Sequence, residues 1–191
     1  MGISLLKGSV LETITADIDF SASNEEDVTI SIDDNIREVI RGRLYIDTDP
    51  GAAFSAWATY TFYNKSAMHG EDAFYRTEAK LVYTELEVAT TGIDANITPD
   101  DQTDFSPNDL ALILDTGNDE FIRLATIANV MVAEDNIGVH SIDDGLARVS
   151  EFSGFQLFNN ESGTDVYLRV SFAAVQTVSL HMELLVRKYY G

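Results

Sequence analysis

The chain has 191 residues and a formal net charge of -20 at pH 7, with 32 acidic residues against 12 lysines and arginines. This charge argues against a nucleic-acid partner, because phosphate binding depends on clustered lysine and arginine side chains that release counterions. Hydrophobic residues make up 45% of the chain, so we expect the acidity on the surface of a folded protein rather than in a disordered tail.

The sequence contains no cysteine, which excludes disulfides, thiolate metal sites and cysteine nucleophiles. Its first residues lack the pattern of a signal peptide, and no apolar run reaches the length of a membrane helix. We therefore expect synthesis in the cytoplasm and no membrane partner.

The first elements in chain order are strands with a period of two. Ile14, Ala16, Ile18 and Phe20 alternate with polar residues, and the pattern resumes from Val28 to Ile32, which predicts two half-buried strands. Asp33 or Asp34, followed by Ile36, Val39 and Ile40, allows a short helix next.

Strand patterns dominate the rest of the chain. The segment from Phe74 to Val88 is apolar on both parities, which indicates a bulge or bend that changes its inward face. Asp115 to Glu120 reads as a hairpin turn. The predicted strands are Phe54–Tyr63, Phe74–Val88, Leu110–Leu114, Phe121–Val132, Phe152–Phe158, Val166–Phe172 and Val175–Tyr190.

About ten strands with little helix predict an all-β protein, an antiparallel β-sandwich of jelly-roll type with long loops. We expect one domain over residues 11–191, preceded at residues 1–10 by an arm that reaches a partner. The arm is suggested by Ile3, Leu5 and Leu6, which are apolar ahead of the first clear strand; an ordinary first strand or frayed terminus is the alternative.

Three acidic loops offer oxygen ligands for calcium, and Asp115, Asp119 and Glu120 in the hairpin turn are the candidate ligands that we select. The alternative is that these residue types simply form tight turns. The three histidines, His69, His140 and His181, lack the spacing of a metalloenzyme.

A group of aromatic residues and a pair of carboxylates suggest alternative functional sites. Trp57, Tyr60 and Tyr63 could bind a sugar ring, or they could fill the core. Glu85 and Glu87 have the spacing of a carboxylate pair on one strand face, which would suit a glycosidase but also occurs on any solvated strand.

The basic residues Arg37, Arg41 and Arg43, with Arg187 and Lys188 near the C-terminus, are candidate contacts between subunits, because arginine is enriched at interfaces. Salt bridges within the chain are the alternative.

The chain resembles virion structural proteins of tailed bacteriophages, in particular head decoration or cement proteins of the β-sandwich type. The resemblance lies in the overall texture: cysteine-free, acidic, one strand after another, and without a catalytic motif. It implies a non-enzymatic virion protein without a cofactor, made in the host cytoplasm, which forms a homo-oligomer, often a trimer, and binds a capsid or tail protein. A carbohydrate-binding or host-surface-binding module, with calcium as an aid, is the alternative function.

Overall fold

The computed structural model describes residues 8–32, 35–66, 70–128, 130–157 and 166–189. For residues 65–66 and 70–72 it describes the backbone only. Ten antiparallel strands form one hydrogen-bonded network, and these residues contain no helix. This confirms the predicted all-β class. The strands are β1 (Ser9–Ile30), β2 (Ile36–Ile46), β3 (Phe54–Ser66), β4 (Gly70–Val88), β5 (Asn96–Pro99), β6 (Leu110–Leu114), β7 (Glu120–Ile127), β8 (Met131–Ala133), β9 (Gly145–Gln156) and β10 (Val166–Tyr189).

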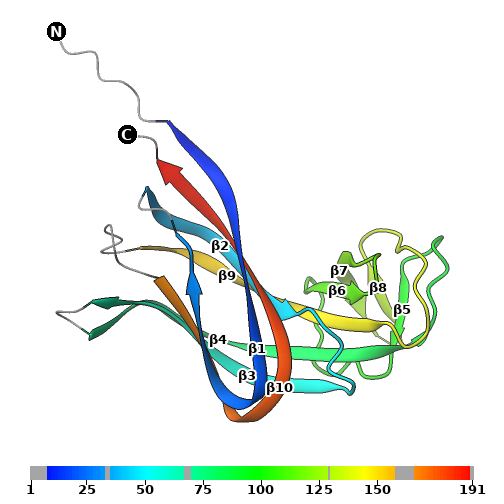
Figure 1. Ribbon diagram of the computed structural model, residues 1–191. Coiled ribbons are helices and arrows are strands. Elements are labelled where there is room, and N and C mark those ends of the chain that lie inside the picture. Colours follow the sequence, from blue (N-terminus) through cyan, green and yellow to red (C-terminus); the bar gives the residue numbers. More distant parts are fainter. Residues whose placement is uncertain (1–7, 33–34, 67–69, 129, 158–165, 190–191) are drawn as a thin grey trace.

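The longest strands, β1 and β10, pair with each other from Ser9 opposite Tyr189 to Ile30 opposite Val166. Both bend near their middle, as Figure 1 shows for β1 in blue and for β10 in orange to red. The register shifts between Ser21 and Glu25, and Ala22 takes a positive φ of 56° at the bend. The two strands predicted at residues 14–20 and 28–32 are therefore one strand that folds over.

The bend places each half of this ribbon in a different sheet. Sheet 1 has the order β1, β10, β2, β9, and sheet 2 has the order β1, β10, β3, β4. The main buried cluster, with Ile18, Leu44, Phe62 and Leu168 among its members, packs between the two sheets. Two four-stranded sheets built by folding long antiparallel ribbons are the jelly-roll arrangement, in agreement with the sequence.

A small lobe lies at one end of the sandwich, formed by β5 to β8 with the adjoining ends of β4 and β9 (Figure 1). It has its own buried cluster. Strand β4 serves both cores: Leu81 and Tyr83 face the sandwich cluster, whereas Val82 and Leu86 face the cluster of the lobe. This explains the apolar pattern on both parities of β4.

The prediction of a short helix after residue 33 is wrong, since residues 36–46 form strand β2. Pairing with β10 skips Arg37 and Ile40, so two bulges interrupt the alternation. The bulges space the buried residues Ile36, Val39 and Gly42 three apart, which imitates a helical pattern.

Several strand boundaries also differ from expectation, and the strands predicted at residues 166–172 and 175–190 are the single strand β10. The segment predicted as one strand over 121–132 is divided into β7 and β8, and β9 begins at Gly145 rather than at Phe152. Within the described part of the chain, no helix is long and apolar enough to cross a membrane.

Candidate functional site

The outer face of sheet 1 carries most of the basic residues that the sequence singled out. Arg43 lies at its centre, 3.5 Å from Glu151 and 3.8 Å from Glu183, with its guanidinium 5.6 Å from the centroid of the Phe121 ring. Arg187 donates a hydrogen bond of 2.8 Å to Glu38. These two arginines are therefore held by ion pairs within the chain.

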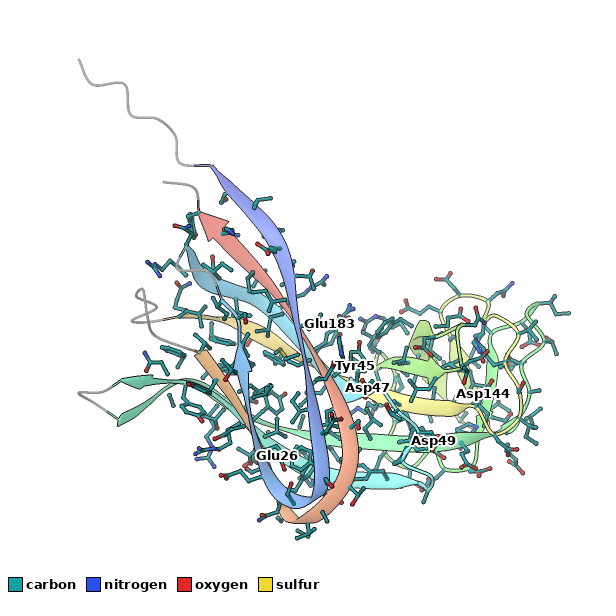
Figure 2. The ribbon with its side chains drawn as sticks, in the orientation of Figure 1. Glu26, Tyr45, Asp47, Asp49, Asp144 and Glu183 are labelled. Carbon is teal, nitrogen blue, oxygen red and sulfur yellow. The ribbon has the colours of Figure 1, made fainter. Side chains whose placement is uncertain are left out.

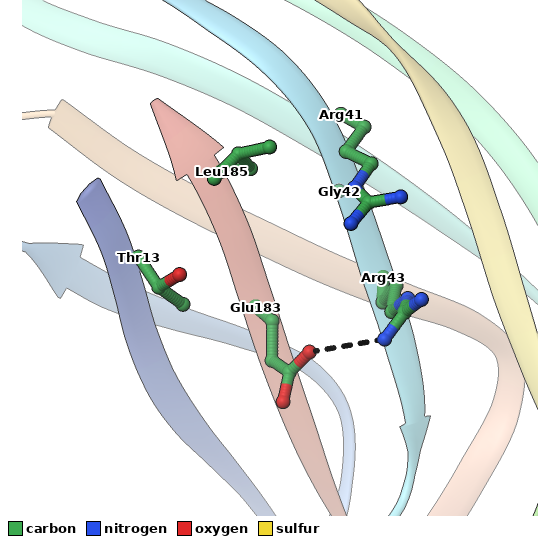
Figure 3. A pocket seen from close by; sticks show the side chains of 6 residues that line it. All are labelled: Thr13, Arg41, Gly42, Arg43, Glu183 and Leu185. Atoms are coloured by element: carbon green, nitrogen blue, oxygen red, sulfur yellow. Dashed lines mark ion pairs between the residues drawn. The ribbon is translucent and has the colours of Figure 1, made fainter. Parts of the chain in front are cut away.

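Lys188 pairs with Glu12 at 3.9 Å, while Arg37 and Arg41 are exposed. Arg41 differs from Arg43, Arg187 and Lys188 because it has no ion pair with any residue that the structure describes. It lines a small pocket of about 60 Å³ together with Thr13, Gly42 and Leu185 (Figure 3). A guanidinium without an ion pair among the described residues is available to an external carboxylate. Arg41 lies on β2, and strand β10 separates it from the edge of sheet 1.

Strand β1 forms that edge. Among the described residues it pairs only with β10, so its other side presents unpaired backbone N–H and C=O groups along its length. Six carboxylates and no basic residue lie between Ser9 and Ile30. Its first residues are different, because Val10 and Leu11 are apolar and 44% and 55% exposed.

The predicted arm lies mostly outside the described residues, including Ile3, Leu5 and Leu6. Its last two residues, Ser9 and Val10, belong to β1, where they pair with Tyr189 and Lys188.

A polar cluster lies where sheet 1 meets the small lobe, and Figure 2 places Tyr45, Asp47 and Glu183 together there. The Tyr45 hydroxyl donates a 3.2 Å hydrogen bond to Glu183, and burial, with the Glu183 charge, raises the pKa of the phenol. Burial likewise raises the pKa of Asp47, against the opposing effect of His181. His181 Nδ1 lies 2.6 Å from Asp17, so Asp17, Asp47 and His181 form one group of ligand atoms on the partly exposed face.

The three aromatic residues of the alternative sugar site do not share a surface. Trp57 is 63% exposed, whereas Tyr60 and Tyr63 are buried. Tyr60 points into the sandwich core and hydrogen-bonds Ser150 at 3.1 Å. Tyr63 faces the other way but is covered by the side chain of Arg169, which lies 5.0 Å from its ring.

Trp57 borders a groove of about 360 Å³, at the place where β4 and β9 diverge into different sheets. The groove has mostly polar walls. Arg148 and Asp109 pair within it at 3.0 Å. Its other lining residues are Glu78, Ala79, Lys80, Asn108, Leu110, Val149, Ser150 and Glu151.

The residues predicted to bind calcium lie in the hairpin between β6 and β7 of the small lobe. Asp119 accepts a hydrogen bond from the backbone N–H of Asp115 and so stabilises the turn. Asp115 and Glu120 instead point to His140, with oxygens 3.1 Å and 2.9 Å from its two ring nitrogens. The structure therefore brings two of the three predicted ligands together, around a histidine that the sequence did not assign to them.

The carboxylate pair Glu85 and Glu87 lies at the end of β4 that enters the small lobe. Glu85 is half-buried and Glu87 is exposed.

Comparison with known proteins gives no relative: no protein-family model, no curated protein and no solved structure matches the chain. The candidate functions are therefore inferred from the geometry of this molecule.

Proposed function

We propose that the protein is a non-enzymatic structural subunit of a virion, which self-associates and binds a capsid or tail lattice to stabilise it. The observation that carries this proposal is the edge of β1 that pairs with no described strand, and whose start carries the exposed apolar residues Val10 and Leu11. An unpaired strand edge is a template for pairing with another chain.

The distribution of charge along β1 favours its first residues as the contact. From Glu12 onward, carboxylates protect the edge against indiscriminate pairing, which is how natural sheets commonly guard such strands. Ser9 to Leu11 carry no charge, so an incoming strand meets no like charge there. The contact therefore belongs at the start of β1.

Arg41 supplies the polar part of the same contact. It lies on the outer face of sheet 1, beyond Leu185, which itself pairs with Thr13 of β1. A second copy of this acidic chain offers many carboxylates that can pair with the Arg41 guanidinium. A closed homo-oligomer, with a trimer as the favoured form, would bury this edge in every copy.

A virion setting agrees with the architecture, since jelly rolls recur in viral capsid proteins. Many identical copies on a lattice make modest contacts collectively tight. A cement protein of this kind needs rigidity and a docking edge rather than a catalytic cleft.

The first experiment measures molar mass by light scattering during size-exclusion chromatography. We expect an oligomer for the unmodified chain and a shift toward monomer for Leu11→Asp and Arg41→Glu. Val175→Asp is the matched control, because Val175 is equally apolar and 63% exposed but lies at the bend of β10. A monomeric unmodified chain, or equal behaviour of Leu11→Asp and Val175→Asp, would contradict the proposed contact.

The second experiment tests lattice binding by cosedimentation with capsids and tails of the virus that encodes the chain. We expect saturable binding that Leu11→Asp weakens and Val175→Asp leaves intact. Recovery of the chain only in the soluble fraction would refute the virion role.

A second candidate function is the binding of carbohydrate at the groove beside Trp57. Exposed tryptophan with polar neighbours suits a sugar ring, and the groove has the volume of a small-ligand site. Trp57 is the only tryptophan, so its fluorescence reports directly on this groove. Saturable quenching by an oligosaccharide, lost in Arg148→Ala, would favour this function; an unchanged spectrum across a panel of glycans would exclude it.

A further inference from the structure

His140 lies buried in the small lobe, with a relative exposure of 1%. Its backbone N–H donates to Thr90 Oγ1, and that hydroxyl donates in turn to the Gly138 carbonyl. Its Nδ1 atom lies 3.1 Å from Asp115 Oδ2, and its Nε2 atom lies 2.9 Å from Glu120 Oε2. Both ring nitrogens therefore face a carboxylate.

A neutral imidazole cannot donate a hydrogen bond to both carboxylates. A neutral ring has one N–H donor and one lone pair, whereas an ionised carboxylate only accepts hydrogen bonds. One of the two contacts would then place a lone pair against a carboxylate oxygen inside the protein. A cation at one ring nitrogen removes this conflict, and the cation can be a second proton or a metal ion.

Asp115, which faces Nδ1, belongs to a group of donor atoms of the kind that a metal needs. Asp115, His140 and Asp144 each present one ligand atom, and these three atoms lie within 4.8 Å of one another. They come from two separate segments, the β6–β7 hairpin and the loop that leads into β9. A single ion at this point would tie the two segments together.

The Nε2 side supplies the orientation. Histidines that bind metal usually donate their other N–H to a carboxylate, which fixes the ring. Glu120 occupies this position and is itself held by the backbone N–H of Gly138 at 2.7 Å. A Cβ atom on residue 138 would lie 2.9 Å from Glu120 Oε2, so glycine leaves the space that this carboxylate uses.

We propose that Asp115, His140 and Asp144 bind a divalent transition metal of the zinc class, with Glu120 orienting the histidine. One imidazole nitrogen with carboxylate oxygens suits Zn²⁺ or Co²⁺, whereas Ca²⁺ prefers ligands that are all oxygen. The proposal replaces the calcium loop expected from the sequence and does not depend on the virion role. The metal would stabilise the small lobe.

The test uses the full chain after dialysis against chelator. Zn²⁺ is titrated by calorimetry, and Co²⁺ is titrated by visible absorption, which reports coordination directly. We expect one ion per chain and a higher melting temperature with metal. Asp144→Asn should weaken binding more than about tenfold, and Glu120→Gln should weaken it about 10- to 100-fold, as outer-shell changes typically do.

His181→Gln is the matched control, because it removes the histidine of the more exposed group with Asp17 and Asp47. Binding that survives His181→Gln and is lost in Asp144→Asn supports the proposal. Asp144 is only half-buried, and Asp144→Asn leaves both carboxylate contacts of His140 in place. This variant therefore removes one proposed ligand without disturbing the buried core of the lobe. Absence of Zn²⁺ and Co²⁺ binding, equal binding by Asp144→Asn, or loss in His181→Gln would overturn it.

Discussion

Gly42 of β2 pairs with Phe152 of β9, and the phenyl ring covers the glycine. A Cβ atom on residue 42 would lie within 2.6 Å of three atoms of this ring, so Gly42→Ala requires the ring to move. Phe152 has little room to do so, because its ring packs 5.3 Å from Tyr60 and 5.8 Å from both Phe62 and Tyr75, centroid to centroid. The substitution therefore overpacks the sandwich core.

Overpacking of this kind costs about 1–3 kcal/mol, and expulsion of the ring would approach the roughly 3–5 kcal/mol of a Phe→Ala change. For a chain of this size, a loss of about 1–3 kcal/mol lowers the melting temperature by about 2–12 °C. Thermal and urea denaturation of Gly42→Ala measure the effect, with Gly8→Ala as the control, because nothing lies within 4 Å of a Cβ at residue 8.

A double substitution separates steric conflict from lost backbone freedom. Phe152→Leu shortens the side chain that covers residue 42, so Gly42→Ala should cost less in that background, with a coupling of about 0.5–3 kcal/mol. Additive losses, or a Gly42→Ala protein as stable as Gly8→Ala, would refute the packing argument.

The Tyr83 hydroxyl is buried without a hydrogen bond of normal geometry, and burial, with the nearby Asp49 carboxylate, raises its pKa. Tyr83→Phe should therefore leave stability in urea unchanged or raise it by about 1 kcal/mol. Tyr60→Phe loses the bond to Ser150 and should cost about 1 kcal/mol; equal effects would contradict this contrast. Hydrogen bonds from Lys80 and Ser55 lower the pKa of Asp104, so its stabilisation is complete above about pH 4 and disappears as pH falls through the lowered value. The stability difference between the unmodified chain and Asp104→Asn should therefore shrink in acid, and a constant difference from pH 7 to about pH 2 would count against it.

Much of the sandwich could be predicted from the sequence, because half-buried strands alternate. Ile18 and Phe20 in β1 and Leu180 and Leu184 in β10 follow this rule and are buried. The continuity of β1 was missed because Ser21 to Asp27 has the composition of a turn, although hydrogen bonding to β10 extends it through a bulge. Strand β2 was missed because bulges change the spacing of its buried residues.

The candidate sites depend on contacts between residues far apart in the sequence. Asp115 and Glu120 were visible as hairpin residues, but no spacing signal connects them to His140, which follows 20 residues after Glu120. The alternation of side chains along a strand already placed Tyr60 and Trp57 on opposite faces of β3. The burial of Tyr63 was invisible, because it depends on Arg169, 106 residues away.

Strand β10 is an inner strand of both sheets, and among the described strands it is the last to be synthesised. Until it is made, β1 has no partner among the described strands, and sheet 1 and sheet 2 each lack the strand that joins β1 to the rest. Pairings such as Ser9 with Tyr189 close almost the whole chain into a loop, and such topologies fold slowly. The sandwich can therefore fold only after β10 has been made, and until then the nascent chain exposes strands that lack their partners.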